Sequence, residues 1–376
     1  MREVELKKLI VEEFLGSIED PRVERTRKHS LETILVLSVL AVISGADSFV
    51  AIEDYGHAKK DWLSTFLDLD AGIPSHDTFG RVFAALNPDV LTRALQRWTA
   101  ALAIASKDKL IAIDGKTLRR SFKHAGDNAF VCMVSAWSAT NGVVLGQVKT
   151  EDDSNEITAI PALLDLIEVK GALVSIDAAG TQTDIADKIV GKGGDYLLAV
   201  KGNQPTLHAE VVELFASHGA GLVSLDSTET LEHAHGRREE RRAWVSHDVG
   251  ELVSAAHWPK LATLVRIQSI RTVRGVQTRE DRYYISSRKK LTAKHALSAV
   301  RAHWSIENSL HWVLDVAFGE DDSRIRAANA AANFAAVRRF ALGLLRRTKA
   351  KVGIKIRRMR AGWDHDFLLH VIGLQS

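Results

Sequence analysis

Residues 172–200 read ALVSIDAAGTQTDIADKIVGKGGDYLLAV, and much of the architecture can be inferred from this stretch. Its two short, largely apolar runs, Ala172–Ile176 and Tyr196–Val200, are typical of buried strands because polar and apolar side chains do not alternate in them. Between them, Thr183–Val190 has the period of a helix. A strand, a helix and another strand in this order predict parallel strands that are covered by helices.

Three further strands are expected before this stretch, at Leu110–Ile113, Phe130–Ala139 and Val143–Lys149. Asn141-Gly142 lies between the last two and is a strong hairpin signal, since both residue types accept positive φ angles. A helix is expected at Ile157–Ile167. Strands joined by a hairpin and followed by alternating helices and strands indicate a mixed sheet, so the predicted fold class is α/β.

The residues before this sheet are expected to form helices. Residues 1–106 have helical periods, including one at Leu31–Ile43 and one that stops at Asn87-Pro88. Within the first of these, Ile34–Ile43 is entirely apolar apart from one serine. Its length is well short of the ~20 residues that a membrane-spanning helix needs, so we expect a buried helix. The N-terminus also lacks the apolar core of an export signal.

The second half of the chain changes character twice. Val223–Ser287 contains short β-like runs without a helical period and indicates a β-rich insertion. A long helix is expected at about Ala293–Val316, followed by a basic helical tail. The predicted segments are therefore a helical N-terminal domain, the first part of the sheet core, the insertion, and the long helix with its tail, at residues 1–106, 107–204, 205–290 and 291–376.

The composition limits the class of protein. The chain has 376 residues, 46% of them hydrophobic and 26% charged, which is typical of a globular protein with two or three domains. A single cysteine, Cys132, excludes a disulfide scaffold and a zinc site built from cysteines. The default compartment is therefore a reducing cytoplasm. The net charge of +3 does not by itself indicate an anionic partner.

Two aspartates follow apolar strands and are candidates for chemistry. Asp114 comes directly after LIAI, and Asp177 directly after ALVSI. Open α/β sheets bind ligands where their strands end, so two carboxylates in this position favour a functional site. The alternative is that aspartate is simply common at strand ends and in turns.

A third acidic residue, Glu307, lies on the predicted long helix. His303, Glu307 and His311 are spaced by four residues and fall on or beside the apolar stripe of that helix. A carboxylate on an inward face is costly unless it is paired or binds a cation. Metal ligation and a buried ion pair both remain open from the helix alone. Together with the two aspartates, such oxygen ligands suit Mg²⁺ or Mn²⁺. The chain has no nucleophile elbow, Walker loop or H-E-x-x-H motif.

Clusters of basic residues suggest an anionic substrate. The segment Arg338–Arg360 contains ten Lys and Arg and no acidic residue, which is what phosphate binding needs beside a metal site. A second cluster begins at His235-Gly236-Arg237-Arg238, where Glu239 and Glu240 allow local ion pairing instead. Lys116, Arg119 and Arg120 follow the first aspartate. The alternative for each cluster is a solvated face.

The chain resembles the DDE transposases of bacterial insertion sequences, in particular the H-repeat-associated branch of the group-four insertion-sequence superfamily. The motifs that carry this resemblance are Ile113-Asp114-Gly115-Lys116, Ser175-Ile176-Asp177-Ala178, Lys201-Gly202-Asn203-Gln204, His235-Gly236-Arg237 and His303-Trp304-Ser305-Ile306-Glu307-Asn308, followed by His311-Trp312 and Asp315. They occur in the family's order and span nearly the whole chain.

This resemblance implies an RNase H-like catalytic core with a preceding helical domain and a β-rich insertion. Asp114, Asp177 and Glu307 would be the catalytic carboxylates and would hold two Mg²⁺ ions, for which Mn²⁺ substitutes. The candidate DNA contacts are Lys116, Arg119, Lys201, Asn203, Gln204, His235, Arg237, His303, Asn308 and His311. Where the wider superfamily has Tyr, Arg and Lys around the glutamate, this chain has Val300, His303 and Leu314.

The function implied is metal-dependent cleavage of double-stranded DNA at the terminal inverted repeats of an element, and transfer of the freed 3′-OH into target DNA. A homodimer on DNA, in a bacterial cytoplasm and associated with the nucleoid, is expected by the same analogy. Two alternatives stay open: a transposase-derived DNA-binding protein without catalysis, and a nuclease without strand transfer.

Overall fold

A computed structural model describes residues 15–16, 18–102, 110–118, 131–150, 155–217, 225–234 and 236–373. By its contacts the chain divides into two compact units. Unit 1 comprises Met1–Ser106, Gly115–Asn155 and Glu307–Ser376, and unit 2 comprises Lys107–Asp114 and Glu156–Ile306. Each unit is therefore assembled from segments that lie far apart in the sequence.

Unit 1 begins with the predicted helices. They are α2 (Leu31–Ile43), α3 (Phe49–Ala58), α4 (Lys60–Leu63), α5 (His76–Ala85) and α6 (Pro88–Leu102), preceded by a 3₁₀ turn at Glu24–Thr26. Twelve of the thirteen residues of α2 are buried, which confirms that its apolar run belongs to a core. Within the described residues, no helix has the length and hydropathy that a membrane crossing requires.

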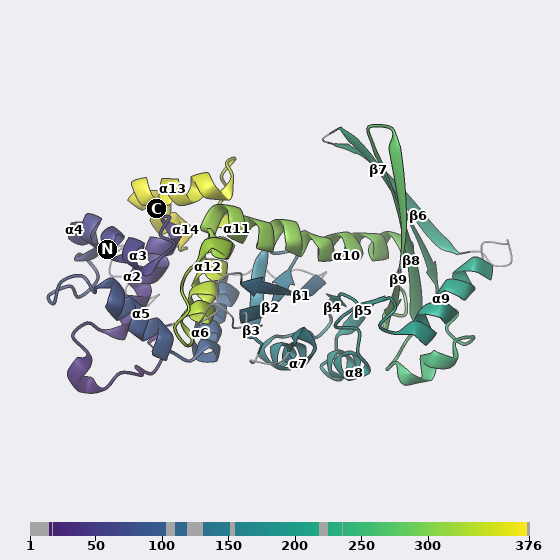
Figure 1. Cartoon of the computed structure of the whole chain (residues 1–376), viewed down its shortest axis with the longest axis horizontal. Coiled ribbons are helices and arrows are strands. Elements are labelled where there is room, and N and C mark those ends of the chain that lie inside the picture. Colours follow the sequence, from purple (N-terminus) through teal and green to yellow (C-terminus); the bar gives the residue numbers. More distant parts are fainter. Residues whose placement is uncertain are drawn as a thin grey trace. The chain divides into compact units, whose positions relative to one another are not determined.

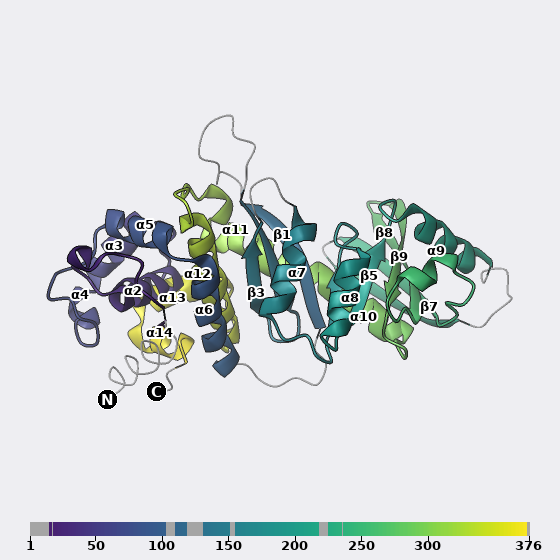
Figure 2. The ribbon, with the colours of Figure 1, turned by 90° about the horizontal axis from the view of Figure 1, so that it is seen from below.

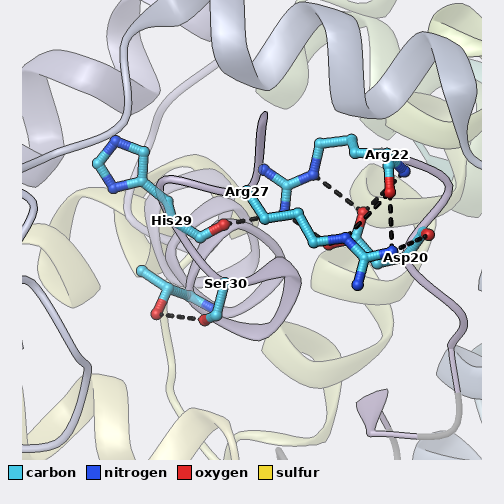
Figure 3. A network of polar contacts seen from close by, with 6 residues as sticks. Asp20, Arg22, Arg27, His29 and Ser30 are labelled. Atoms are coloured by element: carbon cyan, nitrogen blue, oxygen red, sulfur yellow. Dashed lines mark hydrogen bonds and ion pairs between the residues drawn. The ribbon is translucent and has the colours of Figure 1, made fainter. Parts of the chain in front are cut away.

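The segment before α2 is held by a small polar network (Figure 3). Asp20 accepts hydrogen bonds from the backbone N–H of Arg22 at 3.0 Å and from its Nη2 at 2.7 Å. The guanidinium of Arg22 also donates to the carbonyl of His29 at 2.9 Å. Ser30 then caps α2 by accepting the backbone N–H of Thr33 at 3.0 Å. These bonds fix the direction in which the chain enters α2.

The rest of unit 1 surrounds one long helix. The bounds are β2 (Val131–Ser138), β3 (Val143–Lys149), a π-helical turn (Glu307–His311), α11 (Trp312–Phe318), a 3₁₀ turn (Glu320–Asp322), α12 (Ala330–Arg347), α13 (Ile354–Trp363) and α14 (His365–Val371). Sixteen of the eighteen residues of α12 are buried. It packs against α2, α5, α6 and β3, and so joins the N-terminal helices to the β2–β3 hairpin.

Unit 2 is built on a mixed sheet. Its strands are the first part of β1 (Leu110–Leu118), β4 (Leu173–Ile176), β5 (Asp195–Val200), β6 (Asp226–Ala234), β7 (Arg237–Ser246), β8 (Thr263–Val273) and β9 (Val276–Ser286). They are hydrogen-bonded in the order β1-β4-β5-β9-β8-β7-β6. The strands β1, β4 and β5 are parallel, and the rest of unit 2 is antiparallel.

Helices cover both faces of this sheet. Figures 1 and 2 show α7 (Glu156–Leu166) and α8 (Thr183–Gly191) on one face and α10 (Ala293–Ile306) on the other. The buried face of α10 packs on β4, β6, β7 and β8, where Leu297 and Val300 meet Val265 and Tyr284 in one apolar cluster. The helix α9 (Pro205–Ser217) and a 3₁₀ turn (Val253–His257) complete unit 2.

The α/β fold class is confirmed: helices precede a mixed sheet, and the strands β6 to β9 follow its parallel strands in the chain. Within the segment predicted as a β-rich insertion, β9 pairs with β5 over Leu197–Val200. Two details differ from the prediction. The first strand does not end at Ile113 but runs to Leu118. The expected long helix is interrupted by the π turn at Glu307–His311. Of the helical periods expected over residues 1–106, those before Leu15 lie outside the described residues.

Candidate active site

Two of the predicted carboxylates occupy matching positions on neighbouring parallel strands. The last residues in register between β1 and β4 are Ile113 and Ile176. Asp114 directly follows Ile113, Asp177 directly follows Ile176, and both aspartates belong to unit 2. Paired strands lie about 4.8 Å apart, so the register brings the two aspartates to the same edge of the β1–β4 pair. Asp114 differs from the prediction because it lies within β1 and not at its end.

The loop after Asp177 is held in a defined shape. Asp177 accepts a hydrogen bond from the backbone N–H of Gly180 at 3.2 Å, through Oδ1. A side chain at Gly180 would clash, since its Cβ would lie 2.4 Å from Ile176 and 2.8 Å from Ile160. The buried hydroxyl of Thr181 donates to the carbonyl of Ala199 on β5 at 2.6 Å. These contacts fix the carboxylate relative to β4 and β5.

The motif Lys201-Gly202-Asn203-Gln204 braces the same loop. The side-chain amide of Asn203 donates to the carbonyl of Ala178. The amide of Gln204 donates to the carbonyl of Thr181 at 3.0 Å. The structure therefore gives these two residues a role in positioning the Asp177 loop, whereas the side chain of Lys201 is exposed.

A cavity of about 80 Å³ opens beside Asp177, within unit 2. Its polar lining includes Asp177, Lys201, Arg282 and His303, and Trp304 also lines it. A volume of this size holds several water molecules. A carboxylate next to two cationic side chains suits a site that takes both a metal ion and an anionic group such as a phosphate.

His303 faces this cavity from α10. Its Nδ1 lies 3.1 Å from the hydroxyl of Ser175 on β4, and that hydroxyl lies 3.4 Å from the carbonyl of Ile111 on β1. Burial lowers the pKa of His303, and the charge of Asp177 opposes this shift. The imidazole is therefore neutral at neutral pH and acts here as a hydrogen-bonding group.

Sequence reasoning missed Arg282, which lies on β9 and lines the same cavity. Its guanidinium lies over the ring of Trp304, 4.3 Å from the centroid. It also donates to both carboxylate oxygens of Glu280, at 2.8 Å and 3.0 Å. No motif marks this residue, since its place depends on the antiparallel pairing of β9 with β5, which joins residues more than 80 positions apart.

Glu307 is the first residue of the π turn and belongs to unit 1. The prediction that its carboxylate lies on an inward face is wrong, because the side chain is exposed. Glu307 is still in phase with Val300, but unit 2, on whose sheet α10 packs, ends at Ile306. Turns of the π type are frequent at functional sites, and the exposed carboxylate needs no buried partner.

The donor set of the three carboxylates fits Mg²⁺ or Mn²⁺, because both ions prefer oxygen ligands. Among the described residues, no group of three or more His, Cys, Asp or Glu side chains lies close enough to hold an ion. Asp114 and Asp177 belong to unit 2 and Glu307 to unit 1. The convergence of all three on a metal site therefore stays a prediction.

Lys116, a predicted DNA contact, is buried in an ion cluster of unit 1. Its side chain is 9% exposed, and its ammonium group pairs with Asp315 on α11. Asp321 and Glu320 lie at 3.6 Å and 3.9 Å from the same nitrogen. Lys116 also reaches the carbonyl of His311 at 3.5 Å. It therefore ties the end of β1 to the π turn and α11.

His311 lies beside this cluster and carries no charge at neutral pH. Burial and the nearby cations Arg339 and Lys116 lower the pKa of His311 to about 3. It therefore offers no positive charge to a phosphate.

The depressed pKa of His311 predicts a loss of stability in mild acid. Below pH 6.5 the unfolded chain binds a proton that the folded chain excludes, so stability falls as the pH is lowered. Between pH 7.5 and 5.0 we expect this residue to cost about 2 kcal/mol of unfolding free energy. Urea unfolding of the native protein and of His311→Gln at both pH values measures it. Equal pH dependence of the two proteins would contradict the assignment.

Half of the basic run Arg338–Arg360 is buried or hydrogen-bonded within unit 1. Arg338, Arg339 and Arg358 are 2–3% exposed, and for these three the prediction of a phosphate-binding face is wrong. Arg358 donates to the carbonyl of Val42 and pairs with Asp47 at 2.8 Å. Two further arginines donate to backbone carbonyls of unit 1, Arg346 to Ser309 and Arg357 to Leu345, Thr348, Ala350 and Val352.

The remaining cations of this run are exposed, namely Arg347, Lys349, Lys351, Lys355 and Arg360.

The second basic cluster, which begins at His235-Gly236-Arg237-Arg238, contains ion pairs with neighbouring glutamates. Arg237 pairs with Glu239 at 2.9 Å, and Arg242 pairs with Glu240 and Glu229. The alternative of local ion pairing is therefore the one observed there. Asn308 is exposed, whereas Arg119, Arg120 and His235 lie outside the described residues.

Comparison with protein families gives two matches that together span most of the chain. The family described as "Transposase DDE domain" matches residues 105–344, and the one described as "DDE_Tnp_1-associated" matches residues 12–99. The first match contains Asp114, Asp177 and Glu307. The second covers the helices α2 to α5 and most of α6.

Two curated relatives match nearly the full length. The chain is 44% identical to "Putative transposase YncI" of Escherichia coli O157:H7, over 96% of this chain and 93% of the relative. It is 39% identical to "H repeat-associated putative transposase YhhI" of Escherichia coli (strain K12), over 98% of both chains. Among solved structures, a piggyBac transposase synaptic complex with hairpin DNA aligns with 99% of this chain and 83% of that chain. Its TM-score is 0.36 and its identity 8%.

Proposed function

Because this chain belongs to the transposase DDE domain family, we propose that it cleaves DNA at the ends of its element and joins the freed 3′-OH to target DNA. Asp114, Asp177 and Glu307 are the catalytic carboxylates of this proposal. The observation that carries it is the shared position of Asp114 and Asp177 directly after the last registered pair of β1 and β4. Two carboxylates on adjacent strands suit a site for divalent ions.

The three carboxylates would hold Mg²⁺, with Mn²⁺ as a substitute, and two ions per site are proposed. When bound, such ions lower the pKa of a nucleophilic water and stabilise a leaving oxygen. The residues of this chain orient the ligands. Gly180 and Asn203 fix the loop of Asp177, and the neutral His303 links α10 to β4 through Ser175.

The proposed substrate is double-stranded DNA with the terminal inverted repeats of the element, followed by target DNA. Lys201 is exposed and lines the cavity beside Asp177, which supports a contact of this residue with the scissile phosphate. Arg282 lines the same cavity from the opposite strand β9. Bringing two DNA ends together requires two active sites, so we propose a homodimer on DNA.

The test uses the full chain and a linear duplex that contains the DNA flanking its gene on both sides. In Mg²⁺, but not in EDTA, we expect cleavage at one position in each flank and joined products after addition of a target plasmid. Binding without cleavage would favour a transposase-derived DNA-binding protein. Cleavage without any joined product would favour a nuclease.

A further inference from the structure

The helix α13 (Ile354–Trp363) has an inverted arrangement of polar and apolar side chains. It packs within unit 1 against α2, α11, α12 and α14 (Figure 1). Its two buried residues are Ala361 and Arg358. The guanidinium of Arg358 contacts carbonyl and carboxylate oxygens and the ring of Phe318. A surface helix normally buries its apolar stripe and exposes its charges. In α13, by contrast, the hydrogen bonds and the ion pair of Arg358 hold the helix against the rest of unit 1.

The apolar side chains of α13 are on its free face. Ile356, Met359 and Trp363 are 46%, 41% and 70% exposed. Their spacing of three and four residues places them on one side of the helix. Val352, just before the helix, is 41% exposed and continues the spacing. An apolar stripe left uncovered on a helix that is already packed is typical of an interaction surface.

The charge around this stripe selects its partner. No Asp or Glu occurs from residue 323 to residue 363. Lys351 and Lys355 are exposed beside the stripe, Lys349 is exposed in the turn before α13, and Arg347 is exposed at the end of α12. Arg360 is also exposed, but it pairs with Asp364 at 3.5 Å. A symmetric contact with a second copy would bring these cations against their own counterparts, which is unfavourable. A polyanion that also carries flat apolar groups complements both parts of the surface.

We propose that this face of α13 binds single-stranded DNA, with bases stacking on Trp363 and phosphates on Lys351 and Lys355. Duplex DNA hides the faces of its bases, whereas unpaired bases stack on exposed aromatic rings. A duplex that is cut at staggered positions carries such unpaired bases at its ends, so the inference rests on the proposed function only in that the chain acts on DNA. The residues of this surface belong to unit 1, whereas those that line the cavity beside Asp177 belong to unit 2.

The test measures binding of labelled (dT)30 and of a 30-base-pair duplex by anisotropy, in EDTA so that no cleavage intervenes. Trp363→Ala is expected to weaken (dT)30 binding about 10-fold, since stacking contributes ~1–3 kcal/mol per base, and to change duplex binding less than about 2-fold. Trp363→Phe, which keeps an aromatic ring, should retain most of the affinity for (dT)30. Unchanged (dT)30 binding by Trp363→Ala would overturn the proposal.

The cations are tested through the salt dependence of binding. Replacing both Lys351 and Lys355 by Gln should lower the slope of log K against log salt for (dT)30 by about 1.4, at ~0.7 per phosphate contact on a single strand. The matched control replaces Lys289 and Lys290, two exposed lysines of unit 2, and should leave the slope unchanged. Equal loss of slope in both variants would overturn the assignment to α13.

Further outcomes distinguish single-stranded DNA binding by α13 from a dimer contact on the same face and from the proposed catalytic function. If the native protein forms a dimer in the absence of DNA and Trp363→Ala makes it monomeric, the stripe binds a second copy and the DNA assignment is wrong. Binding in EDTA does not depend on catalysis. Loss of (dT)30 binding in Trp363→Ala would therefore support the α13 surface even if the native protein never cleaved DNA, and normal binding would refute it even if cleavage were efficient.

Discussion

Asp177→Asn is expected to reduce DNA cleavage by at least about 10³-fold while the protein stays folded. The change removes the charge of one proposed metal ligand, and loss of several kcal/mol of transition-state stabilisation corresponds to this factor. The fold is preserved because Asn keeps an Oδ1 that accepts the Gly180 N–H. The measurement is the initial rate of strand cleavage in Mg²⁺, on the duplex that carries the DNA flanking the gene.

Glu307→Gln should have an effect of the same order, since Glu307 is exposed and its replacement disturbs no buried partner. Asp187→Asn is the matched control, because Asp187 is an exposed acid on α8 in unit 2. It should cleave at the native rate. A folded Asp177→Asn or Glu307→Gln protein with native activity would mean that the residue is not a catalytic carboxylate. Native activity of Asp177→Asn would also mean that the matching positions of Asp114 and Asp177 do not mark a metal site.

The elements of the sheet were predictable because their signals are local. The strand Val143–Lys149 and the helix Leu31–Ile43 have the predicted bounds, since hairpin residues and a serine cap mark where they begin and end. The extension of β1 to Leu118 was not predictable in the same way. Beyond Ile113 this strand is no longer registered with β4, and its sequence Asp114-Gly115-Lys116 is unfavourable for a strand by composition alone.

The environment of the candidate site was only partly predictable. The aspartates could be found because each directly follows a run of buried residues. The exposure of Glu307 could not, because a helical period extrapolated from α10 does not show that unit 2, on whose sheet this helix packs, ends at Ile306. Sequence motifs also indicated Asn203 and Gln204, but not that their amides bind the backbone of the Asp177 loop.

The basic run shows a further limit. Ten cations without an acid look solvated when only their neighbours in sequence are counted. The partners of Arg358 and Arg339 are Asp47 and Glu320, at separations of 311 and 19 residues. Only the packing of α12 and α13 on the N-terminal helices and on the turn after α11 brings them together. Charge composition therefore indicates a nucleic-acid surface, which stays a prediction, but not which cations are available for it.

Arg339 and Glu320 form a buried pair whose disruption should be among the most destabilising changes in the chain. Both side chains are at most 1% exposed, and Nη1 of Arg339 lies 2.7 Å from Oε1 of Glu320. Arg339→Leu would leave the buried carboxylate without its nearest cation, with Lys116 at 3.9 Å and the charge of Arg338 as weaker compensation. Breaking a buried pair in this way typically costs about 3–5 kcal/mol of unfolding free energy.

The measurement is urea unfolding at pH 7.5 of Arg339→Leu, Glu320→Leu and the double variant. The double variant should recover much of the loss, because replacing both members of a buried pair by apolar side chains is often close to neutral. Arg360→Leu is the control, since Arg360 meets Asp364 at 3.5 Å on an exposed surface, where a pair contributes about 0.5 kcal/mol. A loss below about 1 kcal/mol in Arg339→Leu would mean that the carboxylate of Glu320 is stabilised chiefly by Lys116. Lys116 lies on β1, two residues after Asp114. That result would therefore mean that β1, and not α12, chiefly holds the turn after α11.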